Sequence, residues 1–390
     1  AGYDGVEIMG SEGYFINEFT TPRVNKRSDQ WGGSTRNRYR IAEEILARCR
    51  AVAGPDFIII YRLSMLDLVP DGNSWDEIVE QARMAEATGA TIINTGIGWH
   101  EARTPTIATM VPRAGFSWVT ARMRPLVSVP VVTSNRINTP QVAESVLANG
   151  DADMVSMARP LLADAEFVRK ARQGRAQEIN ICIACNQACL DHVFERKTCS
   201  CLVNPRACRE TELNYLPADR IKSIAVVGAG PAGMACASIA ARRGHRVTLF
   251  EQAGAVGGQF NLAKPIPGKA EFSASIEYFR GELGRSGVDL KLSTKVAAED
   301  LGAFDEVVLA TGVYPRQVTF PGADHVKVIS YLGVLSNEVE VGGRVALVGA
   351  GGIGFDVAEY LSHAHGGEDA SQSSEAFALE WGIDRSLQAR

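Results

Sequence analysis

The sequence predicts an α/β protein made of three successive parts, and three observations support this prediction. Short runs of apolar and β-branched residues alternate with helix-spaced segments from Ala1 to about Leu162. Six of the eight cysteines then crowd between Cys182 and Cys208. Two glycine-rich motifs follow, each between an apolar run and a helical pattern. Regular alternation of strands and helices is typical of parallel sheets with crossover helices.

Five strands are expected in the first part, over Gly5–Met9, Phe57–Leu63, Thr91–Thr95, Val129–Thr133 and Met154–Met157. Intervening stretches such as Arg38–Val52 and Trp75–Thr88 carry apolar residues at helical spacing. Five such units fit an open doubly wound sheet or the C-terminal part of a (β/α)8 TIM barrel of roughly 250 residues. A barrel would lack about three units at its N-terminus. Because residue 1 is also Ala rather than Met, we expect a fragment.

Polar side chains follow these predicted strands. Tyr14 comes after the first strand, Arg62 ends the second, His100 follows the third, and Arg136 and Arg159 follow the last two. In a barrel, the last two positions commonly bind a phosphate, which an Arg fork can hold bidentately. The phenol and the imidazole could form an acid–base pair that gives a proton to a developing carbanion. The alternative is structural, with surface ion pairs and inert hydrogen bonds.

The cysteine-rich segment predicts a metal centre. Cys182, Cys185 and Cys189 are spaced C-x2-C-x3-C and can converge from one loop. A fourth thiolate could come from one of three later cysteines, Cys199, Cys201 or Cys208. Four thiolates suit an iron–sulfur cluster or a structural zinc ion. Zinc sites usually show two separated cysteine pairs, so the single run favours a cluster, with buried free thiols and disulfides as weaker alternatives.

The first glycine motif predicts a dinucleotide site. Gly228, Gly230 and Gly233 form G-x-G-x-x-G between an apolar strand and a helix, and Glu251 ends the next strand. In this context the glycines let the backbone approach a pyrophosphate at the helix N-terminus, and the carboxylate accepts hydrogen bonds from ribose hydroxyls. A further strand, Glu306–Ala310, ends at a tight turn formed by Thr311 and Gly312.

A second copy of the motif follows the apolar run Arg344–Val348 and contains Gly349, Gly351 and Gly354. Two such folds in tandem imply two nucleotides, usually a bound FAD and a nicotinamide nucleotide that reduces it. After its helix the chain turns polar and ends at Arg390, so we expect the second fold to be truncated.

Composition narrows the class of protein. With 46% hydrophobic residues the chain can bury full cores, and a net charge of -5 without long Lys/Arg runs does not suit nucleic acid. No apolar stretch approaches the roughly 18 to 20 residues of a membrane span, and no signal peptide is evident, so we expect a cytoplasmic protein. The expected divisions are a partial barrel, a cysteine segment with linker, and two nucleotide-binding folds, over residues 1–170, 171–216, 217–340 and 341–390. The oligomeric state is left open.

With these motifs assembled, the chain resembles the bacterial NADPH-dependent 2,4-dienoyl-CoA reductases. These belong to the old yellow enzyme, or NADH:flavin oxidoreductase, family and share a plan with trimethylamine dehydrogenase. The most specific matches lie at Gly10–Phe19, Asn94–Arg103, Ser156–Pro160, Cys182–Cys189 and Cys201–Pro205.

The resemblance implies an FMN in the barrel, a [4Fe-4S] cluster, an FAD and an NADPH site, with electrons passing from NADPH through FAD, cluster and FMN to an acyl-CoA in β-oxidation of unsaturated fatty acids. By the same resemblance Tyr14 is the proton donor and His100 its partner. The residues that match cofactor positions are Arg62, Arg136, Ala158 and Arg159 for FMN, Gly258, Gln259 and Val296 for FAD, and Cys182, Cys185, Cys189 and Cys201 for the cluster.

One departure narrows the subgroup. Simple old yellow enzymes carry a His/Asn or His/His pair that grips an enone oxygen, where this chain has Met9 and Glu12. Small enones should therefore be poor substrates and a thioester-conjugated diene a better one. Three alternatives remain: a cluster-containing amine dehydrogenase, an ene-reductase or NADH oxidase, and a zinc-stapled nucleotide sensor without catalysis. As a fragment, the chain is expected to be poorly soluble and inactive.

Overall fold

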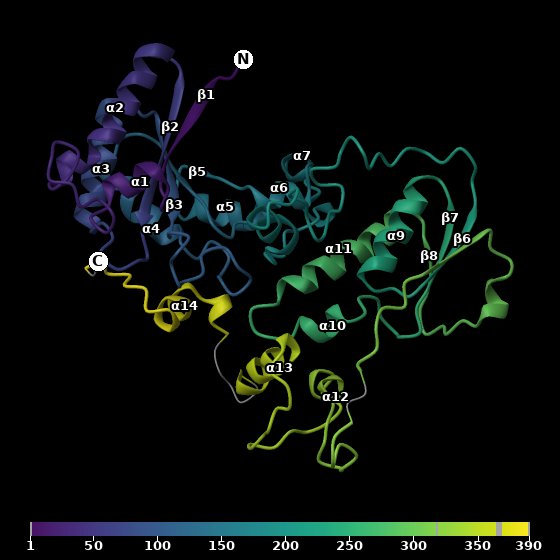
Figure 1. The fold of residues 1–390 in the computed structure, drawn as a ribbon. Helices are drawn as coiled ribbons and strands as arrows, with labels where there is room; N and C mark the ends of the chain where they lie inside the picture. Colours follow the sequence, from purple (N-terminus) through teal and green to yellow (C-terminus); the bar gives the residue numbers. More distant parts are fainter. Residues whose placement is uncertain (1, 317–318, 364–368, 389–390) are drawn as a thin grey trace. The chain divides into compact units, whose positions relative to one another are not determined.

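The computed structural model describes residues 2–316, 319–363 and 369–388. These residues form two compact units, which are drawn in one ribbon in Figure 1. Unit 1 comprises Ala1–Pro160 together with Ala370–Arg390, and unit 2 comprises Leu161–Asp369. Each unit is built on one parallel sheet, so the predicted α/β class is confirmed.

The sheet of unit 1 contains all five predicted strands, and each boundary lies within three residues of its predicted place. The strands are β1 (Gly5–Gly10), β2 (Ile58–Leu66), β3 (Ile92–Ile97), β4 (Val131–Thr133) and β5 (Met154–Val155). Every pair is parallel and the spatial order follows the chain order, β1-β2-β3-β4-β5. This sequential order is the one that consecutive units of a (β/α)8 barrel adopt, because each crossover returns to the next position.

Helices connect these strands as expected from the apolar spacing. They are α1 (Phe15–Thr20), α2 (Thr35–Ala53), α3 (Trp75–Thr88), α4 (Ser117–Met123), the 3-10 turn Arg124–Leu126, α5 (Pro140–Ala148) and α6 (Arg159–Ala163). Local chemistry sets the ends of α3, where Ser74 and Glu77 form a reciprocal capping box and Gly89, at φ 113°, ends the helix. Capping side chains satisfy the backbone N–H groups that the first turn leaves unpaired.

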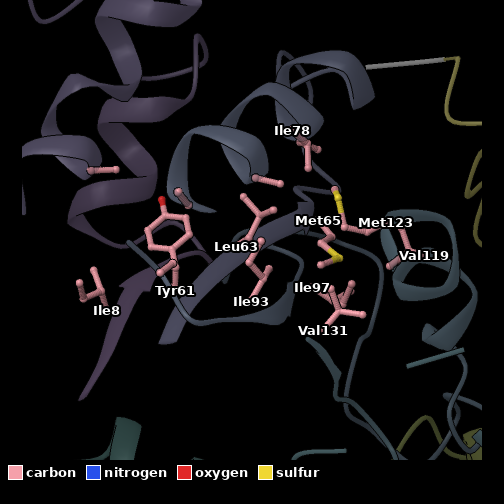
Figure 2. Close-up of a cluster of buried hydrophobic side chains, with 14 of the residues drawn as sticks. Ile8, Tyr61, Leu63, Met65, Ile78, Ile93, Ile97, Val119, Met123 and Val131 are labelled. Atoms are coloured by element: carbon pink, nitrogen blue, oxygen red, sulfur yellow. The ribbon is translucent and has the colours of Figure 1, made fainter. Parts of the chain in front are cut away.

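The core of unit 1 lies between the sheet and its helices (Figure 2). Tyr61, Leu63 and Met65 on β2 are fully buried. The Tyr61 hydroxyl accepts a hydrogen bond of 2.7 Å from Gln81, which satisfies a polar atom that would otherwise be costly to bury. Room for this ring depends on Gly10, because a Cβ there would lie 2.3 Å from the Tyr61 oxygen.

The C-terminal segment belongs to unit 1, which the sequence did not predict. It contains the 3-10 turn Ala370–Gln372 and α14 (Ser374–Glu380). Phe377 is 1% exposed and meets Phe116 edge-on with ring centroids 6.1 Å apart, and the guanidinium of Arg385 lies 5.2 Å from the Trp118 ring. The sequence predicted that residues 341–390 begin a nucleotide-binding fold, but residues 370–390 pack in unit 1. Apolar side chains of α14 make this packing favourable.

The sheet of unit 2 has the order β8-β7-β6-β9 and is parallel throughout. Its strands are β6 (Ser223–Val227), β7 (Arg246–Phe250), β8 (Asp289–Lys291) and β9 (Glu306–Leu309). Its helices and 3-10 turn are α9 (Pro231–Arg242), α10 (Phe260–Ala263), α11 (Glu271–Arg285), Ala298–Leu301, α12 (Tyr331–Leu335) and α13 (Gly352–His363). Placing β6 between β7 and β9 is typical of a Rossmann-like fold.

The second nucleotide fold is only partly formed. Helix α13 follows the second glycine motif as predicted, but Arg344–Val348 is not a strand. A strand is stabilised by the hydrogen bonds of a neighbour, and none of the described strands pairs with this run.

The cysteine-rich segment lies in unit 2 and has little regular structure. It follows α7 (Phe167–Arg172) and the turn Ala176–Glu178 and contains a π-helical turn, Gln187–Asp191, and α8 (His192–Phe194). Buried amides hold it in place: Asn180 donates to the Val203 carbonyl at 2.8 Å and Asn204 donates to the Leu162 carbonyl at 2.8 Å. None of the helices in the described ranges combines the length and apolar character that a membrane span requires.

Candidate active site

Tyr14 and His100 lie together at the carboxyl ends of β1 and β3. The Tyr14 hydroxyl is hydrogen-bonded to Nε2 of His100 at 2.9 Å, and the two rings meet edge-on with centroids 5.2 Å apart. Tyr14 is 47% exposed, so the phenol is accessible to a small molecule. The two residues predicted as an acid–base pair therefore lie within hydrogen-bonding distance of each other.

A polar network lies beside this pair on the same sheet. Arg62 on β2 forms a two-pronged ion pair with Glu7 on β1, with both N···O distances 3.1 Å. Asn94 on β3 donates to the same Glu7 carboxylate at 2.7 Å. Glu7 and Asn94 were not predicted as site residues. Glu7 could have been found from the sequence, because it is a charged residue within an otherwise apolar strand. A carboxylate in such a place is seldom without a partner of opposite charge.

Glu12 connects the network to the pair. Its Oε1 lies 3.7 Å from Nη1 of Arg62. Burial raises the pKa of the Glu12 carboxyl, and the nearby charges of Arg62 and His100 offset only part of that shift. The backbone of Glu12 is left-handed at φ 63°, a conformation that costs a non-glycine residue energy and that recurs at active sites.

The predicted phosphate-binding residues follow the adjacent strands β4 and β5. Asn135 and Arg136 are both left-handed, at φ 69° and 58°. Arg136 is 6% exposed, and its Nε donates to the Val111 carbonyl at 2.9 Å. Ala158 and Arg159 come directly after β5, which pairs with β4. A buried guanidinium beside strained backbone at the ends of neighbouring strands fits an anion such as the FMN phosphate.

In unit 2 the first glycine motif has the geometry of a dinucleotide loop. A Cβ at Gly233 would lie 1.8 Å from the Gly228 carbonyl oxygen, so only glycine allows this close turn. A Cβ at Gly230 would meet nothing within 4 Å, which leaves space next to the backbone. Helix α9 starts at Pro231 without a side-chain cap, so its first N–H groups remain available to a pyrophosphate.

The other residues predicted for FAD surround this loop. Glu251 accepts hydrogen bonds from the N–H groups of Ala229, at 2.7 Å, and Ala253, at 2.8 Å, and its carboxylate retains acceptor capacity for ribose hydroxyls. A Cβ at Gly258 would lie 3.1 Å from the Gly230 Cα, so Gly258 closes over the motif.

The turn after β9 contains further residues that were predicted to bind FAD. Gln259 donates to the Val313 carbonyl at 2.9 Å, directly after Thr311 and the left-handed Gly312. Val296 is half-buried and follows β8. The glycine loop, Glu251 and the turn after β9 fit FAD.

The second glycine motif repeats the local geometry of the first. Gly349 has φ 118°, against 104° for Gly228, and a Cβ at Gly354 would lie 2.3 Å from the Gly349 carbonyl oxygen. Gly351, like Gly230, has open space where a Cβ would point. The turn therefore fits a nucleotide pyrophosphate even though its preceding strand is not formed.

The four predicted cluster ligands form one group of interacting thiols. Burial raises the pKa of Cys201 to about 11; the N–H groups of Val203 and Asn204 lower it in part, and the thiols of Cys182 and Cys185 raise it further. Burial is also the main cause that raises the pKa of the Cys185 thiol. A hydrogen bond from the backbone lowers this pKa in part, and the thiols of Cys182 and Cys189 raise it further.

Cys199 is placed differently. Burial raises the pKa of its thiol, and its next largest interaction is with Cys208, to which it is hydrogen-bonded. Within the described residues, no three Cys, His, Asp or Glu side chains converge closely enough for a single metal ion. Four thiol side chains are a donor set that either a [4Fe-4S] cluster or a zinc ion can take.

Two segments of the chain match known protein families. Residues 1–178 match the NADH:flavin oxidoreductase / NADH oxidase family, and residues 222–371 match the pyridine nucleotide-disulphide oxidoreductase family. The first segment is thus similar to flavin oxidoreductases and the second to pyridine-nucleotide modules.

Several known proteins resemble the chain over most of its length. A metal reductase of Desulforamulus reducens is 39% identical over 370 residues, covering 93% of this chain and 55% of the relative. A cinnamate reductase of Clostridium sporogenes is 33% identical over 384 residues, covering 93% of this chain and 57% of the relative. The solved complex of 2-naphthoyl-CoA reductase with 2-naphthoyl-CoA is 32% identical, with a TM-score of 0.90, and covers 98% of this chain and 61% of that one. The chain thus spans a little over half the length of these relatives.

Proposed function

We propose that the protein catalyses the NADPH-dependent reduction of a 2,4-dienoyl-CoA to an enoyl-CoA, a step in the β-oxidation of unsaturated fatty acids. The observation that carries this proposal is the Tyr14–His100 hydrogen bond at the carboxyl ends of parallel strands in the NADH:flavin oxidoreductase region. NADPH provides a hydride and solvent a proton, and the conjugated diene gains both to leave one double bond.

Four groups would be held by the residues described above. Arg62, Arg136, Ala158 and Arg159 would hold FMN; the first glycine motif with Glu251, Gly258, Gln259, Val296, Thr311 and Gly312 would hold FAD; Gly349, Gly351 and Gly354 would hold NADPH; and Cys182, Cys185, Cys189 and Cys201 would hold a [4Fe-4S] cluster. Bound flavins supply hydride chemistry and exchange single electrons with a cluster, which is the chemistry needed between a nicotinamide donor and the diene.

The chain's own residues manage the proton. The Tyr14 hydroxyl donates a proton to the carbon that becomes negative when hydride reaches the far end of the diene. The hydrogen bond from His100 disperses the charge that then develops on the phenol oxygen. Arg62 is held in place by its ion pairs with Glu7 and Glu12, and it takes no part in proton transfer.

The substrate class rests on two supports. One structural relative is described with a bound aryl-CoA thioester, and one sequence relative is a reductase of an unsaturated acid, cinnamate. In addition, Met9 and Glu12 occupy the positions where simple old yellow enzymes carry an enone-gripping pair. A thioester carbonyl conjugated with two double bonds supplies its own electron withdrawal and depends less on such a pair.

An anaerobic assay with NADPH and three oxidants tests the proposal. We expect 2,4-decadienoyl-CoA to be reduced to an enoyl-CoA with much higher kcat/KM than cinnamate or 2-cyclohexenone. Faster reduction of cinnamate would favour the ene-reductase alternative. NADPH-independent reduction of an electron acceptor by dimethylamine or sarcosine would favour an amine dehydrogenase, an activity named for other relatives of the chain.

A further inference from the structure

Trp99 is linked to both members of the proposed proton-donating pair: it precedes His100 in the chain, and its indole packs on Gly13, which precedes Tyr14. Trp99 is 5% exposed and immediately precedes His100. A Cβ at Gly13, the residue before Tyr14, would lie 3.0 Å from Cε3 of Trp99, so the indole packs directly on this glycine. A displacement of this one ring would therefore move both members of the pair.

A buried carboxylate holds the indole. Asp67, in the loop after β2, is 4% exposed, and its Oδ1 accepts a hydrogen bond of 2.9 Å from Nε1 of Trp99. The backbones run together as well, since the Trp99 N–H donates to the Asp67 carbonyl at 3.0 Å and the Gly98 N–H donates to the Leu66 carbonyl at 2.7 Å. The ring is thus fixed by its polar edge and by its backbone.

The same carboxylate is saturated by neutral donors. Oδ1 also accepts from the Ser64 hydroxyl at 2.6 Å, and Oδ2 accepts from the backbone and side-chain amides of Asn73 at 2.7 and 3.0 Å. Only a group without donors can accept all four bonds. If an Asn at position 67 turns its NH2 toward Ser64 and Trp99, the Ser64 hydroxyl can reverse and accept, whereas the indole N–H cannot. In this orientation the substitution breaks the bond to Trp99.

We propose that Asp67, acting through the indole N–H of Trp99, is a positioning residue that holds Tyr14 and His100 in the geometry for proton donation. The inference rests on the proposed function, because it assigns Tyr14 the proton-donating role. Neither Asp67 nor Trp99 touches the reacting atoms. Their effect is on the alignment of the phenol, where a misplacement on the order of 1 Å can slow a reaction by about 10²-fold.

A double-mutant cycle on the holoenzyme tests the proposal. Asp67→Asn and Trp99→Phe, which removes the indole N–H, should each slow reoxidation of the NADPH-reduced protein by 2,4-decadienoyl-CoA by about 10- to 100-fold. The rate of reduction by NADPH and the melting temperature of the Phe variant should change little. The double variant should be no slower than Trp99→Phe alone, because Asp67 then has no indole N–H to act on. Multiplicative losses in the double variant overturn the proposal.

Two further measurements separate positioning from a structural role and from failure of the proposed function. Asn73→Ala removes the side-chain donor to Oδ2 of the same carboxylate and keeps the backbone N–H of residue 73, so it should lower stability but keep most of the reoxidation rate; a loss equal to that of Asp67→Asn overturns the proposal. In protein with 15N-labelled histidine, the His100 imidazole resonance should move in Asp67→Asn in the same direction as in Tyr14→Phe, and an unmoved resonance also overturns it. If the resonance moves but Tyr14→Phe reoxidises normally, the proton-donor assignment itself is wrong.

Discussion

The Tyr14 hydroxyl lies 2.9 Å from Nε2 of His100, although the two residues are 86 positions apart in the chain. In the sheet, β2 lies between β1 and β3, and the two side chains meet through the loops that follow β1 and β3. Removal of the phenol oxygen alone would break this hydrogen bond.

Tyr14→Phe deletes only the phenol oxygen. We expect reoxidation of the reduced protein by 2,4-decadienoyl-CoA to slow by about 10² to 10⁴-fold, the usual contribution of a positioned proton donor. Reduction by NADPH should be unchanged, and Tyr3→Phe, which alters a phenol that is 79% exposed, is the matched control. Stopped-flow absorbance of each half-reaction measures both rates. Equal loss in both half-reactions would contradict the assignment.

Cys201→Ser and Cys199→Ser distinguish the fourth cluster ligand. Cys201 interacts with Cys182 and Cys185, whereas Cys199 interacts mainly with Cys208 and less with Cys189. Cys201→Ser should therefore lose most of its iron, and Cys199→Ser should keep about four irons per chain. Iron and acid-labile sulfide assays measure this directly. Retention of iron in Cys201→Ser together with its loss in Cys199→Ser would reverse the assignment.

Gly230→Ala and Gly233→Ala separate binding from folding in the first glycine motif. A Cβ at Gly230 meets nothing within 4 Å of protein, so this variant should keep its melting temperature but bind FAD at least tenfold more weakly, because the methyl group takes the space beside the pyrophosphate. Gly233→Ala forces a Cβ to 1.8 Å from a carbonyl oxygen and should destabilise unit 2 by more than about 3 kcal/mol. FAD titration and thermal unfolding provide the readouts, and normal FAD affinity in Gly230→Ala would count against this site.

Gly10→Ala should destabilise unit 1. The added Cβ would lie 2.3 Å from the Tyr61 hydroxyl oxygen inside the core, and overpacking of this kind typically costs about 1–3 kcal/mol. Gly284→Ala in α11 is the control, because its Cβ would meet nothing within 4 Å and the exchange should be neutral or slightly stabilising. Urea unfolding monitored by circular dichroism compares the two. An unchanged midpoint in Gly10→Ala would show that the Tyr61 ring is not packed as described.

The buried ion pair between Arg38 and Glu77 predicts a pH dependence of stability. Burial raises the pKa of Glu77, but the N–H of Ser74 and the charge of Arg38, 2.8 Å away, lower it more, so the net pKa lies below the usual value. A depressed pKa adds stability above the unfolded value, about 4.3, and that stability is lost as the pH falls through the folded value.

Glu77→Gln should therefore be less stable than the parent protein by about 3 kcal/mol at pH 7, because it leaves a buried guanidinium without its counter-ion. The difference should shrink below about pH 4, where the parent carboxylate also becomes neutral. Thermal unfolding between pH 7 and pH 3 measures it, and Glu80→Gln, on the exposed face of the same helix, is the control. A constant difference at all pH values would contradict the lowered pKa.

Much of the fold could be predicted because its signals are local. Strand β2 is a run of Ile, Tyr and Leu with few alternatives to a buried strand, and α3 carries its own capping box in Ser74 and Glu77. Local signals also misled. Arg344–Val348 is an apolar run with two valines that resembles β6, yet it forms no strand, because pairing depends on a neighbour that no local pattern specifies.

The sequence by itself determined the five strands of unit 1 and the glycines that make tight turns, since both depend on side-chain periodicity and on backbone sterics within a few residues. Only the tertiary structure decided that Glu7, Arg62 and Asn94 meet across three strands, that α14 packs on unit 1, and that Asp67 reaches the indole beside His100. Such contacts depend on the register between strands and on the packing of many side chains at once, and neither is encoded in any short stretch of the chain.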